Sequence, residues 1–213
     1  MPPIISIVGK SSTGKTTFLE KLLRELTARG YNVATIKHSH HSIDFDNPSK
    51  DSSRHARAGA VVTMVSSTTS FQIVKQVTQE LTVDELARYL GEEYDLILTE
   101  GFSRGNTPKV EIHRKEAGPL LEVATNLLAV LTDEALEIET PQFGLDDVQS
   151  ITKLIEEKYI LPNRERVSIY FNGQRVPLSN VPQRAINNLL EIVPANLKNS
   201  QPTIDLEFRY YKR

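Results

Sequence analysis

The chain has 213 residues, 39% hydrophobic and 24% charged, a balance typical of globular proteins, and no apolar run approaches the roughly 20 residues of a membrane helix. Its 25 basic and 27 acidic residues leave a net charge of −2, which gives no reason to expect a nucleic-acid partner. The absence of cysteine excludes disulfides, thiolate catalysis and cysteine-ligated metals, and with no signal-peptide pattern we expect a cytoplasmic protein with no membrane association.

The first two predicted elements are a buried strand and an amphipathic helix. Residues 4–8 are almost all β-branched, which is typical of a short buried strand. Apolar residues then recur at helical spacing from Phe18 to Leu26, and Gly30 is a plausible stop signal. A strand followed closely by a helix leaves only residues 9–17 to connect them.

That connection matches the phosphate-binding pattern G-x-x-x-x-G-K-[ST]. Its glycines allow the backbone N–H groups to face inward, and the helix N-terminus adds partial positive charge for phosphate oxygens. We expect Lys15 to reach the β- and γ-phosphates and the Thr16 hydroxyl to bind Mg²⁺. The candidate phosphate-binding residues are Gly9, Lys10, Ser11, Ser12, Thr13, Gly14, Lys15, Thr16 and Thr17. The sequence therefore predicts a protein that binds a nucleoside triphosphate.

Strand and helix signals continue to alternate as far as about residue 160. Thr82 and Glu85 have the form of a capping box that opens a helix. The further predicted strands are 32–37, 60–65, 71–77, 96–99, 109–113 and 127–131, and the further predicted helices are 51–58, 82–90 and 145–159. This alternation predicts an α/β fold of the P-loop NTPase type, with a mostly parallel sheet flanked by helices.

A small α+β C-terminal appendage is predicted after this alternation ends. Asn172 and Gly173 tolerate the positive φ of a tight turn, so they predict a hairpin between strands 167–171 and 174–178. A helix over 181–193 and a strand over 203–210 complete the unit. We therefore divide the chain into a nucleotide-binding domain, residues 1–163, and a C-terminal unit, residues 164–213.

An acidic residue on a neighbouring strand is needed to hold Mg²⁺. Asp95 and Glu100 flank the strand at 96–99, roughly 16 Å apart, so only one of them can lie near the nucleotide. The phosphate loop leaves the C-terminal end of its strand, and Glu100 stands at the same end of a parallel neighbour. Glu100 is therefore the predicted metal ligand and, with Lys15, the predicted catalytic residue.

The segment Lys37-His38-Ser39-His40-His41 follows another predicted strand and has three open interpretations. Its position favours a switch segment or a second anion-binding surface, with Lys37 and His38 as candidate ligand contacts. Its imidazoles also suit Zn²⁺ or Ni²⁺, although no structural zinc spacing is present. A solvated polar loop is the third interpretation.

Further cations and one carboxylate are candidates for contacting the nucleotide. Arg104, Lys109 and Arg114 lie in or beside a polar loop and are candidate phosphate contacts, although each could be an ordinary surface cation. The N-K-x-D guanine signature is absent. Asp133 follows a predicted strand and could either accept hydrogen bonds from guanine or cap a helix, so the residues leave GTP and ATP unresolved.

Taken together, these motifs resemble the MobB family, the molybdopterin-guanine dinucleotide biosynthesis proteins B, over about residues 3–160. The matching segments are 8–17, 37–41, 51–60, 95–102, 108–114, 129–133 and 141–143. The resemblance implies a dimeric, weakly hydrolysing GTP-binding protein that assists a separate molybdopterin guanylyltransferase (MobA-like) in attaching GMP to molybdopterin. It also implies a fold like that of the nickel-insertion GTPases. The expected ligands are GTP and Mg²⁺, with molybdopterin as a further possible partner.

Two functions of other classes remain open at this level. A small-metabolite kinase would use the same phosphate loop, but would need a base near the γ-phosphate and a lid with arginines. A nickel-insertion GTPase or metallochaperone would use the histidines at 38–41.

Overall fold

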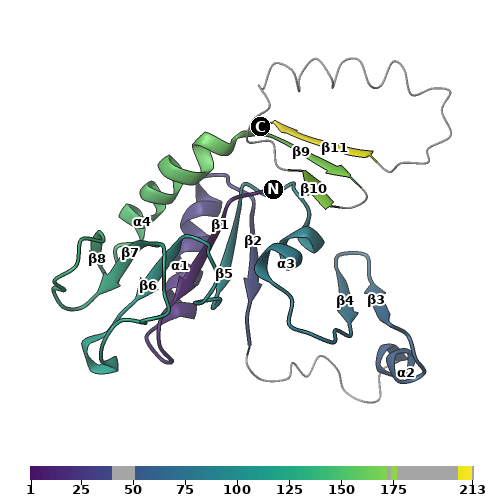
Figure 1. The fold of residues 1–213 in the computed structure, drawn as a ribbon, viewed down its shortest axis with the longest axis horizontal. Coiled ribbons are helices and arrows are strands. Elements are labelled where there is room, and N and C mark those ends of the chain that lie inside the picture. The colour runs from purple at the N-terminus through teal and green to yellow at the C-terminus, as the bar shows by residue number, and fades with distance from the viewer. Residues whose placement is uncertain (40–50, 172–173, 177–205, 213) are drawn as a thin grey trace.

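The computed structural model describes residues 1–39, 51–171, 174–176 and 206–212 and contains a parallel sheet at its centre (Figure 1). The six strands of this sheet lie in the order β2-β5-β1-β6-β7-β8, and every neighbouring pair is parallel. Their bounds are β1 Ile4–Val8, β2 Val33–Lys37, β5 Leu96–Glu100, β6 Lys109–Ile112, β7 Leu127–Thr132 and β8 Gln142–Gly144. The predicted fold class is therefore confirmed.

One face of the sheet is covered by α1 (Lys15–Ala28) and α4 (Val148–Ile155). Ile5 and Ile7 of β1 point to this face, because side chains alternate along a strand, and they pack in one cluster with Leu22 of α1. Both helices contact each other as well as the sheet (Figure 1). This face is the main hydrophobic core.

The opposite face has a smaller apolar cluster near the β2 edge. There α3 (Val83–Leu90) packs Val83 and Ala87 against Ile4 and Ile97 of the central strands. The predicted capping box is confirmed, since the Thr82 hydroxyl accepts from the backbone N–H of Glu85 and the Glu85 carboxylate accepts from that of Thr82. Toward β6 this same face becomes polar.

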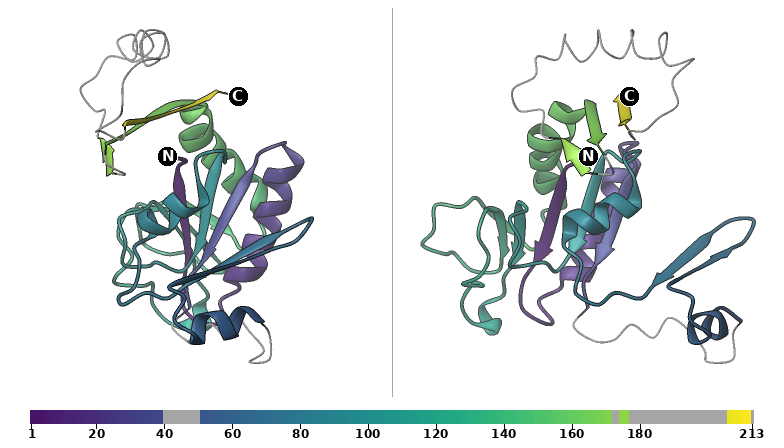
Figure 2. Two further views of the ribbon diagram at one scale, coloured as in Figure 1. Left: turned by 90° about the vertical axis from the view of Figure 1, so that its right-hand side faces the viewer. Right: turned by 45° about the vertical axis from the view of Figure 1, so that its right-hand side comes forward.

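A two-stranded antiparallel hairpin, β3 (Val62–Ser66) and β4 (Phe71–Lys75), lies outside the parallel sheet. It follows α2 (Asp51–Arg57), and Figures 1 and 2 show it standing away from the sheet. Several of its apolar side chains are exposed, Phe71 at 69% and Met64 at 60% among them. Both predicted strands exist, but they form a hairpin of their own.

After α4 the chain continues through a π-helical turn, Glu156–Ile160, and a 3-10 turn, Leu161–Asn163. The described C-terminal strands are β9 Glu165–Phe171, β10 Gln174–Val176 and β11 Leu206–Lys212, antiparallel in the order β10-β9-β11. The predicted hairpin strands are therefore present. The turn residues Asn172 and Gly173 and the helix predicted over 181–193 lie outside the described residues.

Strand β8 is the one element of the parallel sheet that the sequence did not predict. It is only three residues long and offers no periodic pattern. No helix in the described part of the chain is long and apolar enough to span a bilayer.

Leu22→Ala should lower the free energy of unfolding by about 2–5 kcal/mol, because Leu22 is fully buried between α1 and the sheet and its loss leaves a cavity. Urea denaturation followed by circular dichroism measures this change. Glu20→Ala on the exposed side of α1 is the control and should stay within about 0.5 kcal/mol. Equal effects of the two substitutions would contradict the assigned core.

Candidate functional site: the phosphate loop and its two flanks

The loop between β1 and α1 has the backbone that phosphate binding requires. Gly9 has φ 142° and Gly14 has φ 100°, conformations that residues other than glycine rarely adopt. Ser12 is also left-handed, at φ 62°. A Cβ on Gly9 would lie 2.4 Å from the Ile112 carbonyl oxygen, so only glycine lets the loop approach β6 this closely. The α1 helix begins at Lys15, and its N-terminal N–H groups therefore open onto the loop.

Lys15 lies inside the loop and donates to the Lys10 carbonyl over 2.6 Å. Burial lowers the pKa of the Lys15 ammonium, and the nearby Glu100 carboxylate opposes that shift. An ammonium binds a phosphate more strongly than it binds a carbonyl. Lys15 is therefore placed to exchange the Lys10 carbonyl for a phosphate oxygen when a nucleotide binds.

Glu100 meets the phosphate loop at the C-terminal end of β5. Its Oε1 accepts a hydrogen bond from the Thr16 hydroxyl at 2.9 Å and lies 3.4 Å from the Lys37 ammonium. Asp95 lies at the other end of β5, where its Oδ2 accepts from the Asn32 backbone N–H at 2.7 Å. The structure thus brings together Lys15, Thr16, Glu100 and Lys37 and leaves Asp95 apart. The metal role of Glu100 stays a prediction.

His38 is held beside this group by its own contacts. Its Nε2 lies 2.5 Å from Glu80 Oε1, and its ring lies 4.9 Å from the ring of Phe102, centroid to centroid. A Cβ on Gly101 would lie 2.9 Å from the Cβ of His38, so the small residue after Glu100 makes room for the imidazole. The placement of His38 next to Lys37 and Glu100 leaves its predicted ligand contact untested.

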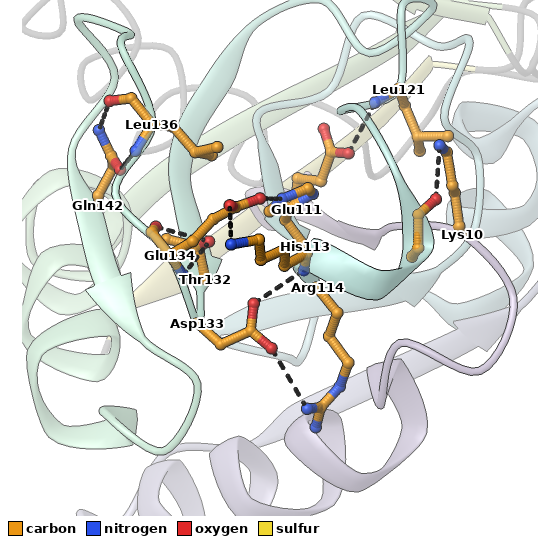
Figure 3. A network of polar contacts seen from close by, with 12 residues as sticks. Lys10, Glu111, His113, Arg114, Leu121, Thr132, Asp133, Glu134, Leu136 and Gln142 are labelled. Atoms are coloured by element: carbon orange, nitrogen blue, oxygen red, sulfur yellow. Dashed lines mark hydrogen bonds and ion pairs between the residues drawn. The ribbon is translucent and has the colours of Figure 1, made fainter.

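Arg114 and Asp133 approach the loop from the β6–β7 side (Figure 3). Arg114 Nε donates to the Thr13 carbonyl at 3.1 Å, and its Nη1 lies 3.7 Å from Asp133 Oδ2. Asp133 Oδ1 accepts from the Lys115 backbone N–H at 2.9 Å. Asp133 is therefore linked through Arg114 to the phosphate loop, although it is partly engaged by these two donors.

Lys109 does not contact the phosphate loop, so its predicted role as a phosphate contact is wrong. The side chain is fully buried, and its ammonium donates to the carbonyls of Gly105, Thr107 and Thr125. Burial also lowers the pKa of this ammonium. All three of its N–H donors are used within the protein, and Lys109 therefore fastens the loop before β6.

Beyond Lys109, two further buried polar residues follow on the same face of β6. Glu111 is 1% exposed; its Oε1 accepts from the Leu121 backbone N–H at 2.8 Å, and its Oε2 has no hydrogen-bond partner. His113 is 4% exposed, and its Nε2 lies 3.0 Å from Glu134 Oε1. The alternation of polar residues with Val110 and Ile112 was a sequence signal for this polar face, and our sequence interpretation did not use it.

Lys10 connects the phosphate loop to this region. Its ammonium donates to the Ala117 carbonyl at 2.9 Å, and Figure 3 shows it beside the segment that leads to Leu121. The loop is therefore held from this side by Lys10 and Arg114.

Within the described residues, no group of three or more histidine, aspartate or glutamate side chains could hold a metal ion. The histidines His40 and His41 lie outside the described residues, and the nickel interpretation of that segment stays untested.

A parallel sheet, a glycine loop between its central strand and the following helix, and an acidic residue beside Thr16 together define a P-loop nucleotide-binding protein. Comparison with known proteins gives the family. Residues 4–133 match the model of MobB, molybdopterin guanine dinucleotide synthesis protein B, and the chain belongs to this family.

The relatives cover most of the chain. The molybdopterin-guanine dinucleotide biosynthesis adapter protein of Haemophilus influenzae is 37% identical over 156 residues, 72% of this chain and 88% of that protein. The adapter protein of Escherichia coli is 34% identical over 163 residues, 74% of this chain and 93% of that protein. The crystal structure of Bacillus subtilis MobB is 28% identical, with a TM-score of 0.58, and covers 74% of this chain and 98% of that one.

Glu111→Gln should change how stability depends on pH. Burial raises the pKa of the Glu111 carboxyl above its ordinary 4.5, so the folded state holds this proton more tightly than the unfolded state and stability is lost as pH rises above 4.5. Glutamine cannot ionise, so the Tm of the variant minus that of the parent should increase from pH 4, below the unfolded pKa, to pH 7. Thermal melts measure the difference, with the exposed Glu116→Gln as control. A constant difference would contradict the prediction.

Proposed function

We propose that this chain is a GTP-binding accessory protein of molybdenum cofactor biosynthesis, which assists the attachment of GMP to molybdopterin. The family and the names of its relatives support this role. The observation that carries the proposal is the meeting of Lys15, Thr16 and Glu100 at one end of the sheet, which provides a cation for phosphates next to two oxygen donors for a metal. The protein is at most a slow GTPase.

The donor set suits Mg²⁺. The Thr16 hydroxyl and the Glu100 carboxylate are hard oxygen ligands, and Mg²⁺ usually takes one or two protein oxygens together with phosphate oxygens and water. Their separation of 2.9 Å is short enough for both to reach one ion. In the proposed complex Lys15 neutralises part of the remaining phosphate charge.

Guanine is the proposed base, with Asp133 as its acceptor. The link from Asp133 through Arg114 to Thr13 places a carboxylate beside the phosphate loop, within the same polar network. The guanine N1 and N2 groups are donors, and a carboxylate offers only acceptors. To bind the base, Asp133 would share its oxygens with Arg114 and Lys115 or release one of them.

The accessory role follows from the chemistry of the loop. Nucleotidyl transfer needs the α-phosphate open to in-line attack, whereas a phosphate loop surrounds the β- and γ-phosphates and directs chemistry to the γ position. We therefore propose that a separate molybdopterin guanylyltransferase performs the transfer. Lys37 and His38, with the loop after Glu100, are then available for a second anion or for this partner.

A homodimer is the proposed assembly, in the cytoplasm. The exposed apolar side chains of the β3–β4 hairpin support it, because a two-stranded hairpin is only marginally stable in water and large exposed apolar patches mark interaction sites. The division into residues 1–163 and 164–213 is likewise a proposal, supported by the change from parallel to antiparallel strands after Asn163.

Glu100→Gln should leave GTP binding without Mg²⁺ largely intact and reduce the gain in affinity that Mg²⁺ provides at least tenfold, because one metal ligand loses its charge. Calorimetry with and without Mg²⁺ measures both affinities. Asp95→Asn, at the opposite end of the same strand, is the matched control and keeps an oxygen to accept from Asn32. If Asp95→Asn reduces the Mg²⁺ gain and Glu100→Gln does not, the choice of carboxylate is wrong.

The chain alone should form no guanine dinucleotide from molybdopterin and MgGTP, and adding a molybdopterin guanylyltransferase should start the reaction. This chain should then raise the rate of product formation, and Lys15→Ala should remove that increase while its circular dichroism stays that of the parent. Chromatography of the product measures the rates. Formation of product without the transferase would overturn the accessory role.

A further inference from the structure

A cleft of about 630 Å³ lies beside the phosphate loop, between the segments that follow β6 and β7. Its walls are mostly apolar, as at Leu121, Leu136 and Ile138, and the polar residues that line it are His113, Lys115, Glu122, Glu134 and Glu137. Because His113 is almost completely buried, its contact with Glu134 fixes a carboxylate within the lining. Apolar walls with a few fixed polar groups are typical of sites for small molecules.

The carboxylate in this cleft keeps acceptor capacity. Glu134 Oε1 contacts His113, while Oε2 lies 4.0 Å from the Lys115 ammonium, too far for a hydrogen bond. Behind the wall, Glu111 holds the Leu121 backbone N–H with one oxygen, and its other oxygen is buried without a partner. A ligand with paired N–H donors on one edge and apolar ring faces matches the Glu134 carboxylate and the apolar walls.

The cleft and the predicted base site depend on consecutive residues, Glu134 and Asp133, whose side chains contact different partners. Asp133 reaches Arg114, which contacts the phosphate loop, whereas Glu134 reaches His113 in the cleft (Figure 3). A nucleotide held by the loop and read by Asp133 would leave Glu134 for a second ring. Lys10 joins the two regions, because it belongs to the loop and donates to Ala117 in the cleft-bearing segment.

We infer that this cleft binds a fused 2-amino-4-oxopyrimidine ring, the ring system that guanine and pterins share, and that a pterin is its occupant, with Glu134 accepting from the ring N–H and the 2-amino group. The inference rests on the proposed function in one respect: GTP occupies the phosphate loop, and so the pterin rather than the nucleotide's guanine enters the cleft. It adds a second ligand site next to the first.

The test is titration of the full chain with pterin, followed by the fluorescence of the ligand. Lumazine, which has a carbonyl in place of the 2-amino group, is the matched ligand control and should bind at least tenfold more weakly. Glu134→Gln should weaken pterin binding at least tenfold and leave GTP affinity unchanged. Glu139→Gln, an exposed carboxylate outside the cleft, should behave as the parent. Leu136→Trp, which places a larger side chain in the cleft, should also weaken pterin binding.

The outcomes separate this site from the phosphate loop. Lys15→Ala should lose GTP and keep pterin, the reverse of Glu134→Gln. If guanosine displaces pterin and Glu134→Gln weakens GTP binding, the ring in the cleft is the nucleotide's guanine and the assignment to a pterin is overturned. If the parent binds GTP but not pterin, or binds lumazine equally well, the inference fails while the proposed nucleotide function stands.

Discussion

The close packing of Gly9 against the Ile112 carbonyl is the constraint on which the rest of the site depends. It holds the phosphate loop over β6, at the centre of a sheet whose strands all end at the same edge. Strand β5 pairs with β1 on the side away from β6. Glu100, at the end of β5, therefore lies beside Thr16 although the two residues are far apart in the sequence. A side chain at residue 9 would push the loop away from β6 and separate it from Arg114.

The polar face of β6 shows how the fold accommodates charges that it buries. Removing Lys109, Glu111 and His113 from water is costly unless each finds partners. Backbone carbonyls supply them for Lys109, a backbone N–H for Glu111 and a carboxylate for His113. Such partners come from irregular segments rather than from a helix, whose backbone groups bond to each other. This half of the sheet is accordingly covered by loops, and loops leave room for a cleft.

Sequence patterns predicted the features that depend on short separations along the chain and on the parallel order of the strands. The β1–loop–α1 unit was predictable because its glycines, apolar spacing and Lys15 are all local, and Glu100 because parallel strands end at one edge. The polar partners were not predictable in this way. Lys109 faces carbonyls set by the course of the chain between Gly105 and Thr125, and three-residue β8 follows from pairing with β7.

The two adjacent carboxylates after β7 suggest how a phosphate loop can serve an accessory protein. Asp133 and Glu134 have separate partners, and those partners, Arg114 and His113, are themselves consecutive at the end of β6. A shift of the phosphate loop on nucleotide binding would therefore act through Arg114 on the turn that also carries Glu134, and through Lys10 on the segment that forms the opposite wall of the cleft. Contiguous contacts of this sort are a physical route by which one ligand can change the affinity for another, and the coupling must act equally in both directions. In a protein with these contacts, the binding of one ligand can change the affinity for the other without the protein catalysing a reaction between them.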